Sequence, residues 1–264
     1  MIKKTLIASM VALAALNIFN SCEKEDKDAV TIDQFQAGIV KIKGSDGKTY
    51  EAVDMGFPSG TLWATCNMGA TSPEQNGNYY AWGETETKTS YSIDNYKWYA
   101  DRDQYKITKY CTNDERGYID HIVGKIDKKT ALDSIDNAVI VNMGSNWNMP
   151  TMTEYKELLY RTTCRWCKLN GVYGYMFTST EKGYTDRSIF LPMGGQFDED
   201  TNDFIGKFGF YWTRTIYSGE TYSASVLQMD HKTADNITVT NTRRERYLGL
   251  PVRPIANKYL LGIN

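Results

Sequence analysis

The chain has 264 residues, of which 41% are hydrophobic and 23% are charged. Its 30 Lys and Arg residues are balanced by 32 Asp and Glu residues, which gives a formal net charge of −2 at pH 7. This balance argues against nucleic acid as a partner, because a phosphate-binding surface needs cationic side chains clustered on one face. The densest cationic segment is Arg243-Arg244-Glu245-Arg246, which we interpret as a solvated loop.

The N-terminal segment has the layout of an export signal. Lys3 and Lys4 precede an apolar run from Leu6 to Leu16, and small Ser21 stands directly before Cys22. The uncharged span is shorter than the roughly 20 apolar residues that a membrane-spanning helix needs. We therefore expect a cleaved signal and a lipid-modified Cys22, because several acyl chains together anchor a protein stably.

Residues 1–22 resemble bacterial lipoprotein signal peptides. The stretch after Cys22, with Lys24, Glu25 and Asp26, resembles the sorting signal of surface-exported lipoproteins of the Bacteroidota. The resemblance predicts a signal peptide over residues 1–21 and a lipid anchor in the outer membrane, with the domain exposed at the cell surface.

A tether and a hairpin are expected next. Residues 22–38 carry few large apolar side chains, which is typical of a flexible tether. Order is expected to begin near Ile39, because Ile39–Lys43 and Thr49–Val53 are strand-like runs that flank Gly44-Ser45-Asp46-Gly47. One domain, spanning residues 39–257, is predicted.

Two helices and several strands follow in the chain. Residues 135–142 have helical spacing, and Thr151–Glu154 forms a capping box that predicts a helix from Thr151 to Arg161. Its apolar stripe should be buried against a sheet. Aromatic and β-branched runs predict strands at Val172–Thr178, Ser188–Leu191, Phe210–Thr215, Tyr222–Met229, Ile237–Thr240 and Tyr247–Val252. Without strand-helix alternation, this order predicts an α+β fold with a curled antiparallel sheet.

Several short motifs together resemble one known family. They are Asp46–Tyr50, Leu62–Asn67, Tyr79–Thr85, Trp147–Thr151, Ile189–Pro192, Tyr211–Thr213 and Val252–Pro254. As a set they resemble the Fibrobacter succinogenes major paralogous domain, although Asn148 stands where that family usually has arginine. The family is distantly similar to C-type-lectin-like and formylglycine-generating-enzyme-like folds, so the resemblance implies a C-type-lectin-like fold.

The enzyme-like part of this resemblance is not supported by the cysteines. Formylglycine-generating enzymes use reactive cysteines near the C-terminal end, whereas the last cysteine here is Cys167. Cys66, Cys111, Cys164 and Cys167 allow three complete pairings, and we expect buried thiols or structural disulfides. Cys164 and Cys167 follow a predicted helix, whereas a redox pair needs a helix N-terminus to stabilise its thiolate.

Candidate ligand-binding residues are few. Asp198, Asp200 and Asn202 are weak calcium candidates, because the EF-hand pattern lacks its glycine and its final glutamate. No other cofactor or metal is expected. Trp63, Trp82, Trp147 and Trp212 are expected in the core. Tyr96, Trp98 and Tyr99 lie in a polar stretch and are our candidates for a surface that binds ligand.

These expectations lead to one functional hypothesis and two alternatives. The hypothesis is a surface-anchored lipoprotein that acts as a non-catalytic binding module for glycans or for a host or partner protein. One alternative is an exported hydrolase that uses two carboxylates, since Asp and Glu are abundant. The other is a structural adhesion component, for which an exposed apolar patch would be evidence.

Overall fold

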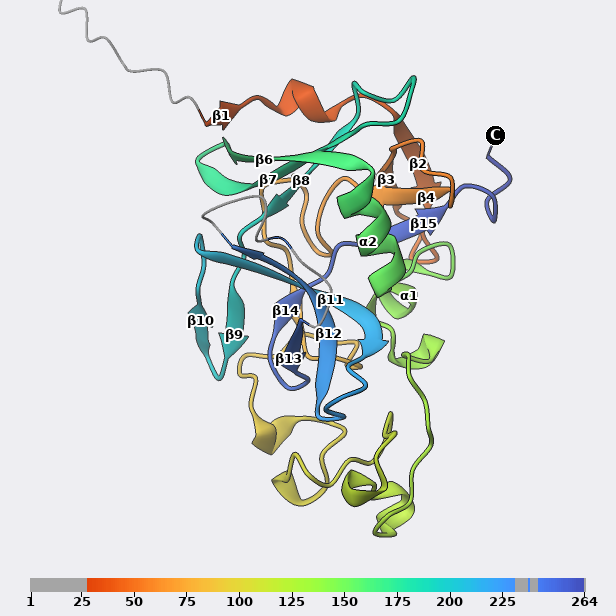
Figure 1. Cartoon of the computed structure of the whole chain (residues 1–264), viewed down its shortest axis with the longest axis vertical. Helices are drawn as coiled ribbons and strands as arrows, with labels where there is room; N and C mark the ends of the chain where they lie inside the picture. The colour runs from red at the N-terminus through yellow and green to blue at the C-terminus, as the bar shows by residue number, and fades with distance from the viewer. Residues whose placement is uncertain (1–27, 231–236, 238–241, 264) are drawn as a thin grey trace, which may run out of the picture.

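The computed structural model describes residues 28–230, 237 and 242–263. Within them the chain forms a single α+β domain with two α-helices and mostly antiparallel sheets, one of them curled (Figure 1). The C-type-lectin-like relationship stays a prediction. The helices are α1 (Ala138–Met143) and α2 (Met152–Tyr160). No described helix is long and apolar enough to cross a membrane.

Two four-stranded sheets form the upper part of the molecule in Figure 1. The first has the order β1 (Ala29–Val30), β6 (Thr162–Leu169), β7 (Val172–Ser179) and β8 (Ser188–Pro192). The second has the order β15 (Ile255–Asn257), β4 (Thr61–Ala64), β3 (Thr49–Asp54) and β2 (Ile39–Lys43). The hairpin predicted from residues 39–53 is confirmed, with Ile39 opposite Val53 and Lys43 opposite Thr49.

Shorter sheets complete the fold. They are β11 (Phe208–Ile216), β12 (Ser223–Asp230) and β13 (Arg243–Glu245) in one sheet, β5 (Tyr79–Tyr80) with β14 (Leu250–Pro251), and β9 (Gln196–Asp198) with β10 (Thr201–Asp203). The predicted strands over 172–178, 188–191, 210–215 and 222–229 are therefore confirmed. The strand predicted for Tyr247–Val252 shrinks to Leu250–Pro251, and most of Ile237–Thr240 lies outside the described residues.

Helix α2 forms where the capping signal predicts it. The Thr151 hydroxyl accepts a hydrogen bond from the Thr153 amide, and the Glu154 carboxylate accepts one from the Thr151 amide. Tyr155 and Leu158 are buried in a cluster with residues of β7, β8 and β12. The amphipathic stripe thus places α2 against the sheets, as the sequence predicted.

The segment before Ile39 is partly ordered, whereas the sequence predicted a flexible tether over residues 22–38. Strand β1 pairs in parallel with β6, and it is followed by a 3-10 turn over Ile32–Phe35. Phe35 is 2% exposed and meets the ring of Phe190 edge-on at 6.0 Å. Burial of these apolar side chains offsets the entropy cost of ordering them, so residues 29–35 belong to the domain and not to a flexible tether.

Four tryptophans form the centre of the core. Trp63, Trp82, Trp147 and Trp212 are completely buried, as the sequence predicted. Two of them also connect distant segments, because Trp82 Nε1 donates to the carbonyl of Thr213 at 2.8 Å and Trp212 Nε1 donates to that of Tyr80 at 2.7 Å.

Arg246 is buried as well, which corrects the interpretation of residues 243–246 as a solvated loop. Its Nη1 and Nη2 atoms donate to the carbonyls of Lys109 and Tyr110, and its guanidinium lies 4.9 Å from the centre of the Trp82 ring. A buried arginine needs acceptors for its N–H groups, and backbone carbonyls supply them here for the two Nη atoms, whereas Nε has no partner among the described residues.

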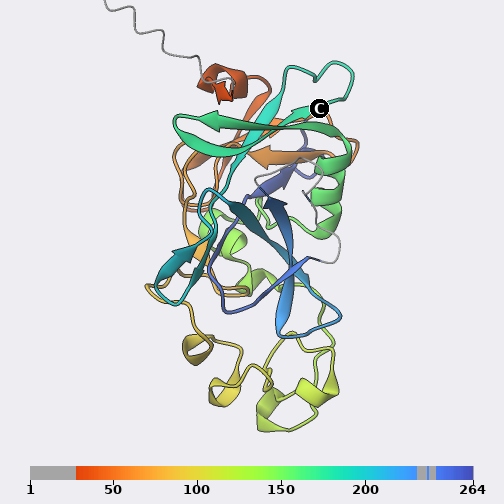
Figure 2. The ribbon, with the colours of Figure 1, turned by 60° about the vertical axis from the view of Figure 1, so that its left-hand side comes forward.

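Residues 86–131 form a lobe of turns and 3-10 segments at the end of the molecule opposite to β1 (Figures 1 and 2). Residues 99–107 and 118–126 repeat the pattern Tyr-x-Asp-(Arg or His)-x-x-x-Lys-Ile. Asp101 and Asp120 both have positive φ, and each forms an ion pair with the lysine five positions later. The lobe therefore contains the same turn twice.

Candidate functional site

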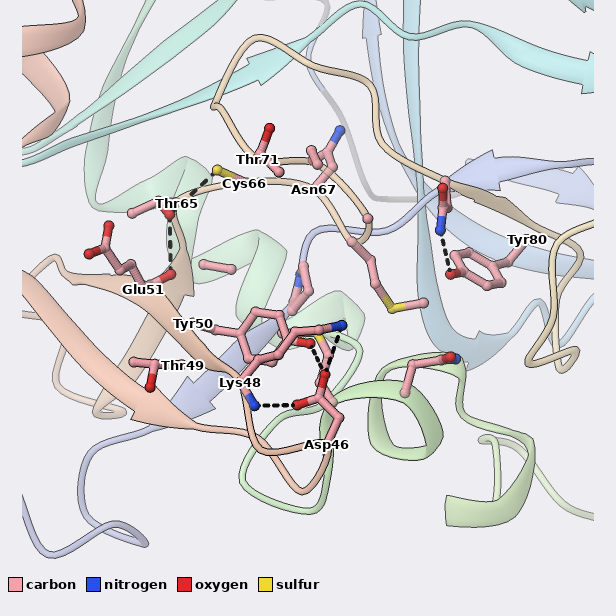
Figure 3. A pocket seen from close by; sticks show the side chains of 18 residues that line it. Asp46, Lys48, Thr49, Tyr50, Glu51, Thr65, Cys66, Asn67, Thr71 and Tyr80 are labelled. Carbon is pink, nitrogen blue, oxygen red and sulfur yellow. Dashed lines mark hydrogen bonds and ion pairs between the residues drawn. The ribbon is translucent and has the colours of Figure 1, made fainter.

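An open cleft of about 580 Å³ lies between segments that are far apart in the sequence (Figure 3). It is lined by the tip of the β2–β3 hairpin and the start of β3, by residues 64–71 from the end of β4 onward, by Asn78 and Tyr80 at β5, by the end of α1 and by Pro254. Its volume lies within the range of about 300–1,000 Å³ that is typical of small-molecule sites.

Asp46 organises the hairpin tip. Its carboxylate accepts hydrogen bonds from the Lys48 amide at 3.1 Å and from the Tyr50 hydroxyl at 2.7 Å. The hydrogen bond from Tyr50 lowers the pKa of Asp46, while burial and Asp46 raise the pKa of Tyr50 to about 12. The turn is also attached to α1, because the Ser45 amide donates to the carbonyl of Met143 at 3.0 Å.

Arg253 lies beneath residues 64–67, which form part of the cleft wall, and it is completely buried. Its Nη1 atom donates to the carbonyls of Ala64 and Thr65 at 2.8 and 2.7 Å, and its Nε atom donates to Asn67 Oδ1 at 2.9 Å. Its Nη2 atom donates to the carbonyl of Phe190 at 2.6 Å. One side chain thus holds the cleft wall and strand β8 together.

Tyr80 lies across the cleft from Tyr50 (Figure 3). Its hydroxyl oxygen accepts a hydrogen bond from Asn78 Nδ2 at 3.3 Å, and burial raises its pKa. Tyr50 and Tyr80 both line the cleft. The Tyr50 ring is fixed edge-on against Trp147 at 5.9 Å.

The two carboxylates of the cleft are both engaged. Asp46 lies 3.3 Å from the Lys48 ammonium, and Glu51 lies 3.6 Å from the ammonium of Lys41 across the hairpin. A glycosidase acid must hold its proton at neutral pH, which requires a raised pKa, whereas the pKa of Asp46 is lowered. The lowered pKa of Asp46 therefore does not suit the role of a glycosidase acid.

The aromatic candidates of the polar stretch are mostly buried, so the expectation of a surface platform is wrong for two of the three. Tyr96 is 3% exposed and donates its hydroxyl proton to the carbonyl of Trp82 at 2.6 Å. Tyr99 is 7% exposed and donates to the carbonyl of Tyr222 at 2.8 Å. Trp98 is half-buried, and its Nε1 donates to the carbonyl of Gly83 at 3.1 Å.

Trp98 belongs to an ionic cluster at the junction between the lobe and the core. The ammonium groups of Lys97 and Lys109 lie 4.3 and 5.2 Å from its ring centre. Both lysines pair with the carboxylate of Asp136, which is 2% exposed. This packing gives Trp98 a structural role.

The weak calcium candidates lie in the β9–β10 hairpin, which does not bring their side chains together. Asn202 is opposite Phe197, whereas Asp198 is opposite Thr201, so Asn202 and Asp198 point to opposite faces. Asn202 Nδ2 donates to the Tyr79 hydroxyl at 3.0 Å. Among the described residues, no group of three or more His, Cys, Asp and Glu side chains could hold a metal ion.

The four cysteines in the described part of the chain, Cys66, Cys111, Cys164 and Cys167, are free thiols. Cys164 and Cys167 are both in β6, where positions three apart point to opposite faces of the sheet. Burial raises the pKa of both thiols, that of Cys167 to about 11. Neither a redox pair nor a disulfide between them fits this strand.

Sequence reasoning did not locate the cleft, although a signal for it was available. Four of the motif segments behind the family resemblance contribute lining residues, namely 46–50, 62–67, 79–85 and 252–254. These segments lie up to about 200 positions apart, so only the folded chain shows that they meet. Comparison of the chain with protein-family models, curated proteins and solved structures gave no match.

Proposed function

We propose that this chain is a surface-anchored lipoprotein whose domain, of the Fibrobacter succinogenes major paralogous kind and C-type-lectin-like, binds a ligand in the cleft without turnover. The observation that carries the binding role is the cleft itself, in which family-like segments converge over the buried Arg253. A site that is rigid before binding loses less conformational entropy when a ligand arrives.

The chemistry of the cleft supports binding over hydrolysis. Its carboxylates are held by Lys48, Tyr50 and Lys41, whereas hydrolysis by two carboxylates needs one proton donor with a raised pKa. The thiol of Cys66, which lines the cleft, accompanies no histidine among the lining residues, so no familiar nucleophile and base pair is present there.

The lipid anchor is supported by the sequence around Cys22, which lies outside the described residues. Because β1 begins at Ala29, six residues separate Cys22 from the folded domain. At about 3.3–3.6 Å per residue, this connection holds the domain within about 25 Å of the anchored cysteine. The lobe then faces away from the membrane, at the end opposite to β1 (Figures 1 and 2).

The anchor is tested by fractionation of cells that express the Cys22→Ser variant. We expect this variant to leave the membrane fraction, while Cys66→Ser, the matched control at another cysteine, stays membrane-bound. Equal membrane association of the two variants would refute the anchor.

Binding is tested with the full chain in detergent micelles against a glycan array and a panel of host-surface proteins. The variant Thr71→Trp places a bulky ring in the cleft, and Lys182→Trp does the same on an exposed loop elsewhere. We expect Thr71→Trp alone to abolish binding, and mass spectrometry to recover the bound ligand unchanged. Consumption of the ligand would instead identify an enzyme.

Exposed apolar side chains in the lobe favour a second candidate function, that of an adhesion component. Ile122 and Val123 are adjacent and are 54% and 82% exposed, and Tyr105 of the repeated turn is 45% exposed. Exposed apolar side chains that adjoin, as Ile122 and Val123 do, are typical of protein contacts. Attachment of cells to protein-coated surfaces should fall with Val123→Asp, but not with the matched Val141→Asp, if the lobe has this role.

A further inference from the structure

The chemical class of the ligand can be inferred from the hydrogen-bonding groups of the cleft that have no partner. This inference rests on the proposed binding function and narrows it. The lining residues include one ammonium group, that of Lys48, and it is paired with Asp46. A phosphate or sulfate ester would therefore meet no unpaired cation and would approach the carboxylates of Asp46 and Glu51, which is unfavourable.

The neutral polar groups of the cleft, in contrast, have hydrogen-bond donors and acceptors that are not used within the protein. The Tyr80 hydroxyl accepts from Asn78 Nδ2, but its own proton has no acceptor among the described residues. Asn78 Oδ1 likewise has no donor there. Asn142 uses its Nδ2 protons on the carbonyls of Thr85 at 2.9 Å and Ala138 at 2.8 Å, which leaves its Oδ1 atom free to accept.

One unused donor and two unused acceptors thus line the same cleft. Alcohol hydroxyls match such a set, because each one donates and accepts at once. The Tyr50 and Tyr80 rings add apolar faces with polar edges, and contacts at Trp147 and Asp46 hold Tyr50 in place before any ligand binds.

We propose that the cleft binds a neutral, hydroxyl-rich saccharide of one to a few sugar rings, with Tyr80 as donor and Asn78 and Asn142 as acceptors. Hydroxyl pairs of the sugar bridge these groups, while the tyrosine rings cover its apolar face. Anionic sugars are disfavoured because the one ammonium group that lines the cleft, that of Lys48, is already paired with Asp46.

The test compares neutral oligosaccharides with sialylated, sulfated and phosphorylated ones of the same backbone, using the full chain in detergent and a glycan array followed by calorimetry. Two variants report on the unused groups. Tyr80→Phe removes the donor but keeps the buried ring, and Asn142→Ala removes an acceptor from an exposed side chain outside the core. The controls are Tyr105→Phe and Asn146→Ala, which change the same residue types outside the cleft lining.

Neutral saccharides should bind more tightly than their anionic counterparts, and each cleft variant should weaken binding by about tenfold, the loss expected for one hydrogen bond. The controls should leave affinity unchanged. Preference for anionic sugars, absence of saccharide binding, or affinity that neither cleft variant alters would each overturn the inference.

Two outcomes with the Thr71→Trp variant distinguish a wrong ligand class from a wrong binding site. A peptide or anionic ligand that Thr71→Trp displaces would leave the cleft as a binding site but refute the saccharide class. A saccharide that still binds the Thr71→Trp variant would refute the cleft as the site itself.

Discussion

Arg253 Nε donates a hydrogen bond to Asn67 Oδ1 at 2.9 Å, which joins two completely or almost completely buried residues that lie 186 positions apart. Through this contact a residue near the C-terminal end of the chain fixes residues 64–67, which form part of the cleft wall. The Asn67 amide in turn donates to the carbonyl of Asn76 at 3.0 Å, so the connection extends into the next loop.

Replacement of Arg253 should therefore be costly. Arg253→Lys keeps the charge but cannot reach four acceptors in the plane of a guanidinium, so we expect the free energy of unfolding to fall by about 3 kcal/mol or more. Urea denaturation measures the change. The matched control Arg243→Lys alters a partly exposed ion pair with Glu220 and should cost less than about 1 kcal/mol. Equal losses in the two variants would contradict the structural role of Arg253.

Asp136 should make the stability of the lobe junction depend on pH. Burial alone would raise its pKa, but hydrogen bonds from Lys109, Tyr110 and Lys97 outweigh burial, and the net pKa is lowered. A carboxyl whose pKa is lower in the folded state stabilises the protein above its unfolded pKa, near 3.9, and loses this contribution as pH falls through the folded value.

Asp136→Asn should accordingly destabilise the protein by about 2–4 kcal/mol at pH 7 and by progressively less below about pH 4. Melting temperatures of both proteins across this pH range measure the effect. The control is Asp101→Asn, which alters an exposed ion pair with Lys106. It should have little effect on the melting temperature, both at pH 7 and below about pH 4. A difference between wild type and Asp136→Asn that is independent of pH would argue against a paired carboxylate.

Tyr50 should ionise only in strong alkali. Burial, followed by its hydrogen bond to Asp46, raises its pKa to about 12. In Asp46→Asn the electrostatic part of this shift is removed, so the pKa should decrease but stay above 10 because burial persists. Carbon-13 tyrosine NMR measures it, with Tyr50→Phe to assign the resonance. A pKa near 10 in the wild type would mean that the hydroxyl lies free in water.

The free thiols lead to a prediction about redox conditions. Because no disulfide joins Cys66, Cys111, Cys164 and Cys167, reductant should leave the melting temperature unchanged. A thiol reagent should modify half-buried Cys66 in the native protein far faster than Cys167, whose pKa of about 11 and complete burial suppress its thiolate. A decrease of several degrees on reduction would show that a stabilising disulfide exists.

Local patterns predicted the elements that depend on neighbouring residues. The Thr151–Glu154 capping box placed the start of α2, and the Gly44–Gly47 turn placed the first hairpin, because the hydrogen bonds of both motifs are made within a few residues. The signal-like segment ending at Cys22 is similarly local, and it stays a prediction.

Burial of polar and aromatic side chains could not be predicted in this way. Arg246 follows two other charged residues in a segment that looks solvated, and Tyr96 lies in a polar stretch, yet both are enclosed by chain that arrives from elsewhere. Ala29–Phe35 shows the same limitation, because only β6 and Phe190 supply the surface that orders it.

The amino-acid sequence by itself thus determined the class of fold, the position of its main hairpin and helix, and the tryptophans of its core, since hydrophobic pattern and turn chemistry act over short distances. Only the tertiary structure decided which groups share the cleft. Tyr50, Tyr80 and Asn142 come from separate elements, so only the folded chain brings them to one cleft. The wall at residues 64–67 is held in the same way, because the buried guanidinium of Arg253 needs acceptors and finds them on backbone carbonyls from distant segments.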